Sequence, residues 1–287
     1  MTQSKRLCYT AGGGVDRTID GPGFVSRHSS SAFDHPSEER TLNKMHGTFF
    51  QTSDGVPVPA VTAAQMREVD RIAVDEMGLG VLQMMENAGR TLALNVIEML
   101  GRVGGRVAVL AGSGGNGGGG LCCARHLHNR GFTVDVVLSK APGKMRGAAR
   151  AQLEILRATG VEPSENATAA VLKAEATVDA LIGYSLRGAP QCRAAELIEI
   201  CNLHSRRTLS LDVPSGLDAT SGETPGMVVR PERTLTLALP KSGLRYAPGE
   251  LYLADIGIPP EVYRRLGIPV EPFFGDRYWL EVRAIGD

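Results

Sequence analysis

Short apolar runs alternate with longer amphipathic segments along most of this chain, and this alternation constrains the fold more than any other feature. The runs that we interpret as strands are 106–111, 133–139, 177–183, 207–213, 233–239 and 251–256. Segments of ten or more residues with helical periodicity separate the first four runs. Parallel strands need connections of this length, and helices then cover both faces of the sheet. The sequence therefore predicts an α/β fold, a Rossmann-like three-layer αβα sandwich with a mostly parallel sheet.

The first helix marks the expected start of the folded domain. Thr62 and Gln65 have the spacing of a capping box, and apolar residues follow them at helical spacing. Residues 1–57 are instead rich in glycine, serine and charged residues, with little periodicity. Such segments bury too little apolar surface to fold. We therefore predict a disordered N-terminal extension at 1–57 and a single domain at 58–287.

Charge and composition exclude several classes of protein. The 287 residues include 31 Lys or Arg and 31 Asp or Glu, so the basic excess of a nucleic-acid-binding protein is missing. The longest apolar runs, such as 134–138, are too short to cross a bilayer. The five cysteines show no CxxC spacing and are typical of reduced thiols. We expect a cytoplasmic protein with no nucleic-acid or membrane partner, and leave open organellar targeting by the extension.

A glycine-rich segment follows the first predicted strand. Residues from Gly112 to Gly117 fit the pattern G-x-G-x-x-G, and we expect a loop at 112–120 and a helix at 121–130. Glycines let the backbone approach a phosphate closely, and the helix N-terminus offers free N–H groups. This pattern favours a nucleotide site, although a tight packing turn uses the same residues. In such sheets ligands bind outside the carboxyl ends of the strands, so 183–189 and 212–218 are candidate segments as well.

A nicotinamide-dependent dehydrogenase is one function that this loop suggests. Such enzymes place an acidic residue at the end of the next strand, where it holds a ribose hydroxyl. Here that strand ends at Ser139 and Lys140, and Asp135 lies in its middle. The missing acid disfavours hydride transfer.

Taken together and in order, several motifs resemble the NAD(P)H-hydrate epimerases, the YjeF N-terminal family. The similarity covers about residues 60 to 268. The motifs are Thr62–Met66, Met85–Gly89, Gly112–Leu121, Ala124–Leu127, Val178–Gly183, Asp212–Asp218, Leu239–Lys241 and Asp255–Pro259. The resemblance implies an isomerase that interconverts the R and S epimers of hydrated NADH and NADPH (NADHX and NADPHX) during nicotinamide nucleotide repair. It also implies a homodimer and a separate dehydratase that acts downstream.

The resemblance also assigns roles to individual residues. Asp212 matches the catalytic aspartate, and Asn116, Asp179 and Ser215 match the ligands of a potassium ion. The positions that match substrate-binding residues are Gly115, Asn116, Gly117, Gly118, Gly119, Gly183, Tyr184, Ser185, Leu186, Arg187, Gly188, Ala189 and Asp212.

The residues themselves support two of these roles and leave alternatives open. Asp212 ends an apolar strand and precedes Pro214, so a carboxylate at the sheet edge could exchange protons with a ligand, or could cap the turn. Asp179 lies inside an apolar run, where an unpaired charge would be costly to bury. A bound cation or a hydrogen-bonding loop would relieve that cost. Arg187 could face a pyrophosphate or be a solvated surface residue.

The glycine segment departs from the family pattern, which usually reads Gly-Pro-Gly-Asn-Asn-Gly-Gly-Asp-Gly. This chain has Ser113, Gly115 and Gly119 in place of the proline, the first asparagine and the aspartate. Loss of these side chains, together with the greater flexibility of the added glycines, predicts that the binding free energy of the ligand is weaker by roughly 3–6 kcal/mol. Two functions therefore stay open: an epimerase that uses Asp212 and potassium, and a weakened or inactive relative that acts as a nucleotide- or protein-binding module.

Overall fold

A nine-stranded sheet runs through the computed structural model, which describes residues 50–285. Its strand order is β2-β1-β9-β8-β7-β6-β5-β3-β4. The strands are β1 (Phe50–Thr52), β2 (Pro57–Val58), β3 (Gly105–Ala111), β4 (Phe132–Leu138), β5 (Ala176–Ala180), β6 (Thr208–Leu211), β7 (Arg233–Leu237), β8 (Glu250–Ala254) and β9 (Trp279–Ala284). Strands β3 to β8 are parallel, and β9, β1 and β2 join the sheet antiparallel. The predicted α/β class with a mostly parallel sheet is confirmed.

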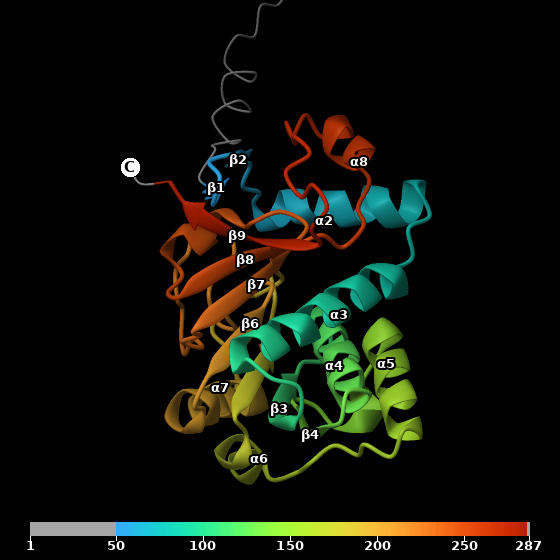
Figure 1. The fold of residues 1–287 in the computed structure, drawn as a ribbon, viewed down its shortest axis with the longest axis vertical. Helices are drawn as coiled ribbons and strands as arrows, with labels where there is room; N and C mark the ends of the chain where they lie inside the picture. The colour runs from blue at the N-terminus through green and yellow to red at the C-terminus, as the bar shows by residue number, and fades with distance from the viewer. Residues whose placement is uncertain (1–49, 286–287) are drawn as a thin grey trace, which may run out of the picture.

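Helices cover both faces of this sheet (Figure 1). Those on one face are α3 (Val81–Leu100), α4 (Gly115–His128) and α5 (Gly147–Ala158), and those on the other are α6 (Ala167–Lys173) and α7 (Cys192–His204). Near β9 lie α2 (Ala63–Arg71), its π-helical continuation η1 (Ile72–Glu76) and α8 (Pro260–Arg265), and the short turns are η2 (Pro142–Lys144) and η3 (Ser242–Tyr246). Among residues 50–285, no helix is long and apolar enough to span a membrane.

Strand β3 shows why the strands of this sheet are continuous apolar runs in the sequence. Val107 and Val109 pack into the core under α3 and α4, whereas Ala108 and Leu110 pack under α6 and α7. Successive residues of a strand point to opposite faces, so a strand covered on both sides needs apolar residues throughout. The three-layer arrangement follows from this pattern.

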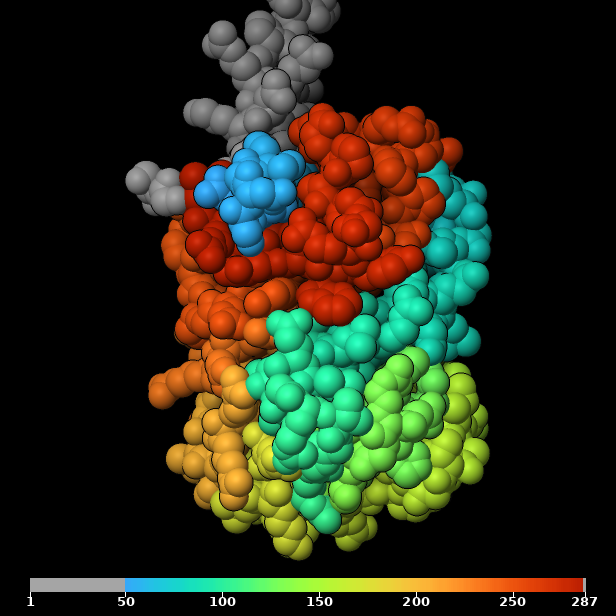
Figure 2. Space-filling view, in the orientation of Figure 1, coloured from blue at the N-terminus to red at the C-terminus, as the bar shows by residue number. Residues whose placement is uncertain are grey.

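The predicted start of the domain is wrong for residues 50–57. Phe50 is fully buried and pairs with Ala284 of β9, and β2 closes a hairpin against β1. Figure 2 shows this segment in blue, seated against the C-terminal part of the chain in red. These strands are too short to show periodicity, and their partner lies at the far end of the sequence. Residues 1–49 of the predicted extension lie outside the described part of the chain.

The glycine segment is helical earlier than the sequence predicts. Helix α4 begins at Gly115, so the expected loop up to Gly120 contains the first turns of the helix. A Cβ atom on Gly120 would lie 2.5 Å from the Cβ of Ala180 in β5, and one on Gly118 would lie 2.5 Å from the sulfur of Met85 in α3. Close packing on both sides thus outweighs the poor helix propensity of glycine.

The chain order of the strands places a crevice beside α4. Strand β3 pairs with β4 on one side and with β5 on the other, so successive crossovers leave it in opposite directions. Ligands of doubly wound sheets bind at such a topological switch point, beyond the carboxyl ends of the strands. Asn116 follows β3, Gly183 follows β5 and Asp212 follows β6, so the fold brings three predicted site segments to this edge.

Candidate active site

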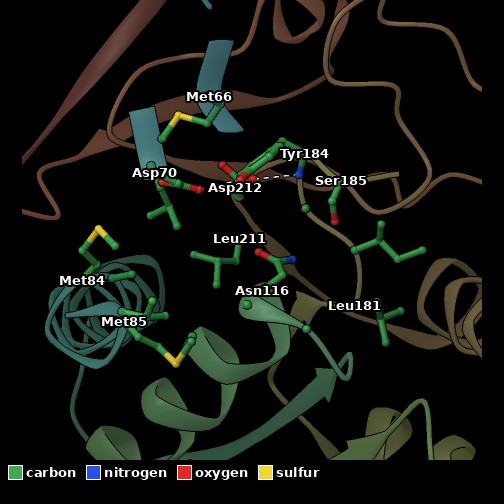
Figure 3. Close-up of a pocket in the computed structure, with 18 of the residues that line it drawn as sticks. Met66, Asp70, Met84, Met85, Asn116, Leu181, Tyr184, Ser185, Leu211 and Asp212 are labelled. Carbon is green, nitrogen blue, oxygen red and sulfur yellow. Dashed lines mark hydrogen bonds between the residues drawn. The ribbon is translucent and has the colours of Figure 1, made fainter. Parts of the chain in front are cut away.

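A cavity of about 560 Å³ opens at this edge of the sheet (Figure 3). Helix α2 and the start of α3 form one side, and the N-terminus of α4 and the segments after β5 and β6 form the other. The methionines Met66, Met84 and Met85 supply apolar lining, whereas Asp70 and Asp212 contribute carboxyl groups. A concave, largely apolar site with a few convergent polar groups is typical of small-molecule binding.

Asp212 has an unusual backbone conformation. Its φ angle is +68°, and the N–H of Val213 donates to the carbonyl of Leu211 at 2.9 Å across it. Such a three-residue turn is rare and strained for a residue other than glycine, at a cost of about 1–3 kcal/mol. The turn ends β6 abruptly and leaves the Asp212 carboxyl group in the wall of the cavity. Strain of this kind persists where the surrounding contacts fix the geometry.

Lys241 supplies the main contact that fixes Asp212. Its ammonium group forms a salt bridge with Oδ1 of Asp212 and also donates to the carbonyl of Leu237 at 2.8 Å. Oδ2 of Asp212 accepts a hydrogen bond of 2.9 Å from the backbone N–H of Tyr184 (Figure 3). Side-chain exposure is only 1% for Lys241 and 6% for Asp212. The site therefore contains an oriented carboxylate whose charge is balanced by a buried cation.

Tyr184 connects this pair to a second carboxyl group. Its hydroxyl donates to Oδ2 of Asp70 at 2.5 Å, and both side chains line the cavity. Burial raises the pKa of Asp70 above its ordinary value, although the hydrogen bond from Tyr184 opposes this effect. Burial likewise raises the pKa of Tyr184, so its hydroxyl stays protonated and acts as a donor. Tyr184 thus contacts both carboxyl groups of the cavity, but only Asp212 also forms a salt bridge with Lys241.

Asp179 is fully buried in β5, and the surrounding loop satisfies both of its oxygens. Oδ1 accepts from the hydroxyl of Ser215 at 2.6 Å and from the N–H of Leu181 at 3.2 Å. Oδ2 accepts from the N–H of Ser215 at 2.9 Å and from the hydroxyl of Ser210 at 2.8 Å. Burial nevertheless raises the pKa of Asp179. The hydrogen-bonding loop alone is therefore sufficient to explain an acidic residue in this apolar strand.

The three predicted potassium ligands converge on the segment after β5. Ser215 accepts a hydrogen bond of 2.8 Å from the N–H of Ile182, and a Cβ atom on Gly183 would lie 3.2 Å from Oδ1 of Asn116. The Nδ2 atom of Asn116 is buried without a hydrogen-bond partner among the described residues. Amide, hydroxyl and carboxylate oxygens suit a hard cation, so the donor chemistry fits. Potassium binding here stays a prediction.

The remaining predicted substrate-binding residues fall into three groups. Gly115, Gly119, Gly183 and Ser185 line the cavity. Gly117 and Gly118 are not among the lining residues and pack closely against backbone or side chains. Leu186, Arg187, Gly188 and Ala189 lie outside its lining, and Arg187 is exposed to solvent.

The two substituted positions of the glycine segment have different surroundings. A Cβ atom on Gly115 would meet nothing within 4 Å, so this position faces open space. A Cβ atom on Gly119 would lie 2.7 Å from Cδ2 of Leu211. Leu211 therefore occupies the space beside Gly119, and a larger residue there would require that leucine to move.

Sequence reasoning missed the roles of Asp70 and Lys241. Lys241 ends the motif Leu239–Lys241, but nothing in the neighbouring sequence indicates that its ammonium group reaches Asp212. Asp70 resembles a solvated acid on an amphipathic helix. Charged residues are rarely buried without a partner, and both partners here come from distant segments.

Asp135, the acid considered for a dehydrogenase, pairs instead with Arg106 of the neighbouring strand at 2.7 Å. It lies in the middle of β4, away from the strand's carboxyl end. The residues that follow β4 and line the cavity are Ser139 and Lys140, and neither of them is acidic.

A doubly wound α/β domain with a carboxylate and a glycine-rich helix start at its switch point defines a class of small-molecule-binding proteins. The family model described as "YjeF-related protein N-terminus" matches residues 81–243. This chain belongs to that family.

Curated relatives support this assignment, and a solved structure shares the fold. The NAD(P)H-hydrate epimerase of Dehalogenimonas lykanthroporepellens is 51% identical over 222 residues, which cover 76% of this chain and 90% of the relative. The bifunctional NAD(P)H-hydrate repair enzyme Nnr of Hyperthermus butylicus is 40% identical over 211 residues, which cover 70% of this chain and 39% of that longer protein. The crystal structure of yeast ynu0 has the same fold, with a TM-score of 0.69 and 23% identity over 77% of this chain and 99% of that chain.

Proposed function

We propose that this chain is an NAD(P)H-hydrate epimerase, an isomerase that interconverts the R and S forms of NADHX and NADPHX. The observation that carries the proposal is the Asp212 carboxylate, which Lys241 orients in the wall of the cavity. A relative named as an NAD(P)H-hydrate epimerase is 51% identical to this chain. A separate dehydratase would then restore the cofactor from one epimer. The bifunctional relatives that carry the name of a repair enzyme are consistent with such coupling.

The reaction requires proton transfer at the hydroxyl-bearing carbon of the hydrated ring. Asp212 is fixed at both oxygens, so it can accept or return a proton at one defined position. The N-terminus of α4 opens at the cavity, where free N–H groups and the helix dipole favour an anionic pyrophosphate. Asn116, Asp179 and Ser215 would hold potassium through oxygen atoms, and the bound ion would supply positive charge to the anionic nucleotide.

The test is turnover of a mixture of R and S hydrates of NADH. An S-specific dehydratase first consumes one epimer, and this protein is then added in potassium buffer. We expect the remaining epimer to disappear faster than at its spontaneous rate. Asp212→Asn should lower the rate about 100- to 10,000-fold, the typical contribution of a positioned acid or base. Asp135→Asn, whose carboxylate pairs with Arg106 outside the cavity, is the matched control.

A second function, the nucleotide- or protein-binding module, is favoured by Gly115 and Gly119. These positions lack the side chains that the family pattern places at the cavity. Folded protein that binds NADP but does not accelerate epimerisation would establish this second function. Acceleration that Asp212→Asn abolishes would exclude it.

The proposed potassium site has a direct test in stability. A cation that binds only the folded protein raises the free energy of unfolding as its concentration increases. We expect potassium to raise the melting temperature more than equal concentrations of lithium, and Ser215→Ala to remove the difference. Equal effects of both salts on the parent protein would contradict a specific site.

A homodimer and a cytoplasmic location complete the proposal. Light scattering coupled to size exclusion should give twice the chain mass of 30.5 kDa. A mass of one chain would contradict the dimer. Fractionation of the source cells tests the location, and recovery in an organelle would assign targeting to the N-terminal region.

A further inference from the structure

Asp70 is a second carboxyl group of the cavity, and it comes from a different element than Asp212. It lies in the last turn of α2, which is the side of the cavity away from the strand ends (Figure 3). Tyr184 bridges the two groups, because its hydroxyl donates to Asp70 and its backbone N–H donates to Asp212. The role proposed for Asp212 leaves this carboxyl group without a function.

We propose that Asp70 is a second proton-transfer residue, which works with Asp212 as an acid–base pair during epimerisation. This inference rests on the proposed epimerase function and adds a catalytic residue to it. The bridge through Tyr184 fixes the relation between the two carboxyl groups while leaving both at the cavity surface.

Inversion of a carbinol carbon bonded to a ring nitrogen needs both an acid and a base. Protonated Asp70 donates its proton to the hydroxyl group as the C–O bond breaks, and water leaves while the nitrogen lone pair forms a C=N bond. Water then adds to the other side of the carbon, the C=N electron pair returns to nitrogen, and the Asp212 carboxylate accepts the proton of the incoming water. One water leaves and one enters, and the carbon keeps its oxidation state. The net proton movement from Asp70 to Asp212 is reversed by the opposite turnover or by exchange with solvent.

The surroundings of the two carboxyl groups favour opposite starting states. Asp212 forms a salt bridge with Lys241, which stabilises a carboxylate. Asp70 is not in a salt bridge among the described residues; it accepts a hydrogen bond from the neutral hydroxyl of Tyr184, and burial raises its pKa. The charged or titratable groups that act on Asp70 are Tyr184, Lys241, Asp212 and Tyr263. Paired carboxyl groups in unlike environments are the usual basis for separate acid and base roles.

Contacts with a distant segment of the chain also hold helix α2, which carries Asp70, in place. The N-terminal end of α2 is attached to the site, because Val61 pairs with Lys241 and donates from its N–H to the carbonyl of Pro240 at 3.0 Å. Directly after Arg71 the helix widens into the π-helical segment η1. Short π-helical segments within α-helices frequently occur at functional sites. Asp70 is therefore held on an anchored helix rather than on a free loop.

Asp70→Asn is the first test, since asparagine can still accept the hydrogen bond from Tyr184 but cannot exchange a proton. We expect kcat to fall about 100- to 10,000-fold, as for loss of a positioned acid or base, with KM within roughly threefold of the parent value. Asp75→Asn is the matched control, because Asp75 is exposed on the adjacent helical segment. A kcat for Asp70→Asn within roughly threefold of the parent enzyme would overturn the proposal.

Tyr184→Phe supplies a readout that a purely structural role of Asp70 would not change. In the proposed mechanism Asp70 acts as an acid only while it is protonated, so activity declines at high pH when Asp70 loses that proton. The Tyr184 hydrogen bond lowers the pKa of Asp70. Its removal should therefore move the alkaline limb of kcat/KM to higher pH, and Asp70→Asn should abolish that limb. An unmoved limb in Tyr184→Phe would overturn the assignment.

The failure of this inference is distinguishable from failure of the epimerase function. A folded parent protein without turnover would remove the proposed function itself. An active parent protein whose rate depends on Asp212 but not on Asp70 would remove only the second proton-transfer residue.

Discussion

Lys241 shows how a single residue links stability to the site. Its charge is almost wholly removed from water, and three acceptors surround its ammonium group: Asp212, the carbonyl of Leu237 at 2.8 Å and the hydroxyl of Thr236 at 3.4 Å. An ammonium group has three hydrogens, so each acceptor can receive one. The same contacts that compensate burial of the charge also orient the carboxylate that faces the cavity.

Replacement of Lys241 should therefore be costly for folding. Lys241→Met keeps most of the side-chain volume but leaves Asp212 buried without its cation, and we expect a loss of about 3–5 kcal/mol in the free energy of unfolding. Adding Asp212→Asn to this variant should recover part of the loss, since the unpaired charge is then gone. Urea unfolding of the two single variants and the double variant measures the coupling. Strictly additive losses would contradict an energetically coupled pair.

Asp179 offers a prediction that depends on hydrogen-bond direction. Two of its four donors are backbone N–H groups, from Leu181 to Oδ1 and from Ser215 to Oδ2. In Asp179→Asn, either orientation of the amide places an NH₂ group against one of these donors. We expect a loss of about 1–3 kcal/mol despite removal of a buried charge, measured by urea unfolding. A variant as stable as the parent protein would show that the loop rearranges to accept the amide.

At the scale of elements, the strand ends were predictable and the start of α4 was not. Asp212 could be placed at the sheet edge because an apolar run ends there, and parallel strands bring their carboxyl ends together. The helical start at Gly115 conflicts with glycine propensity, and only the contacts of α4 with α3 and β5 explain it. Asp70 and Lys241 likewise depend on pairing between elements that are far apart in sequence. The local sequence pattern thus located the sheet edge at which the site lies, but not the residues from distant segments that contact Asp212 and Tyr184.

The glycines at the start of α4 should differ sharply in their tolerance of a methyl group. Gly115→Ala meets no atom within 4 Å, and we expect a gain of about 0.4–1 kcal/mol from a less flexible unfolded chain. Gly120→Ala would place its Cβ 2.5 Å from that of Ala180 in β5, and overpacking of this kind typically costs about 1–3 kcal/mol. Thermal and urea unfolding of both variants provide the comparison. Equal losses in the free energy of unfolding at the two positions would show that close helix packing is not the reason for glycine at these positions.

At the scale of the whole molecule, the parallel part of the sheet and its edge have different origins. Strands β3 to β8 alternate with covering helices and could be recognised from their apolar runs. The edge made of β9, β1 and β2 joins segments from the two ends of the described chain. No local pattern indicates this pairing, and for that reason the sequence-based boundary at residue 58 excluded β1. The edge is also where α2 begins, so it lies close in sequence to the helix that carries Asp70.

Two truncations would measure what this edge contributes. Removal of residues 1–49 keeps β1 and β2 and removes most of the extension that the sequence predicts to be disordered, so we expect an unchanged free energy of unfolding. Removal of residues 1–58 also deletes Phe50 and Val58, both fully buried, and leaves the edge of β9 unpaired. Burial of two such side chains contributes about 1.5–3 kcal/mol each, so the longer truncation should lose roughly 3–6 kcal/mol in urea unfolding. Equal stability of the two truncated proteins would mean that β1 and β2 pack on the sheet without stabilising it.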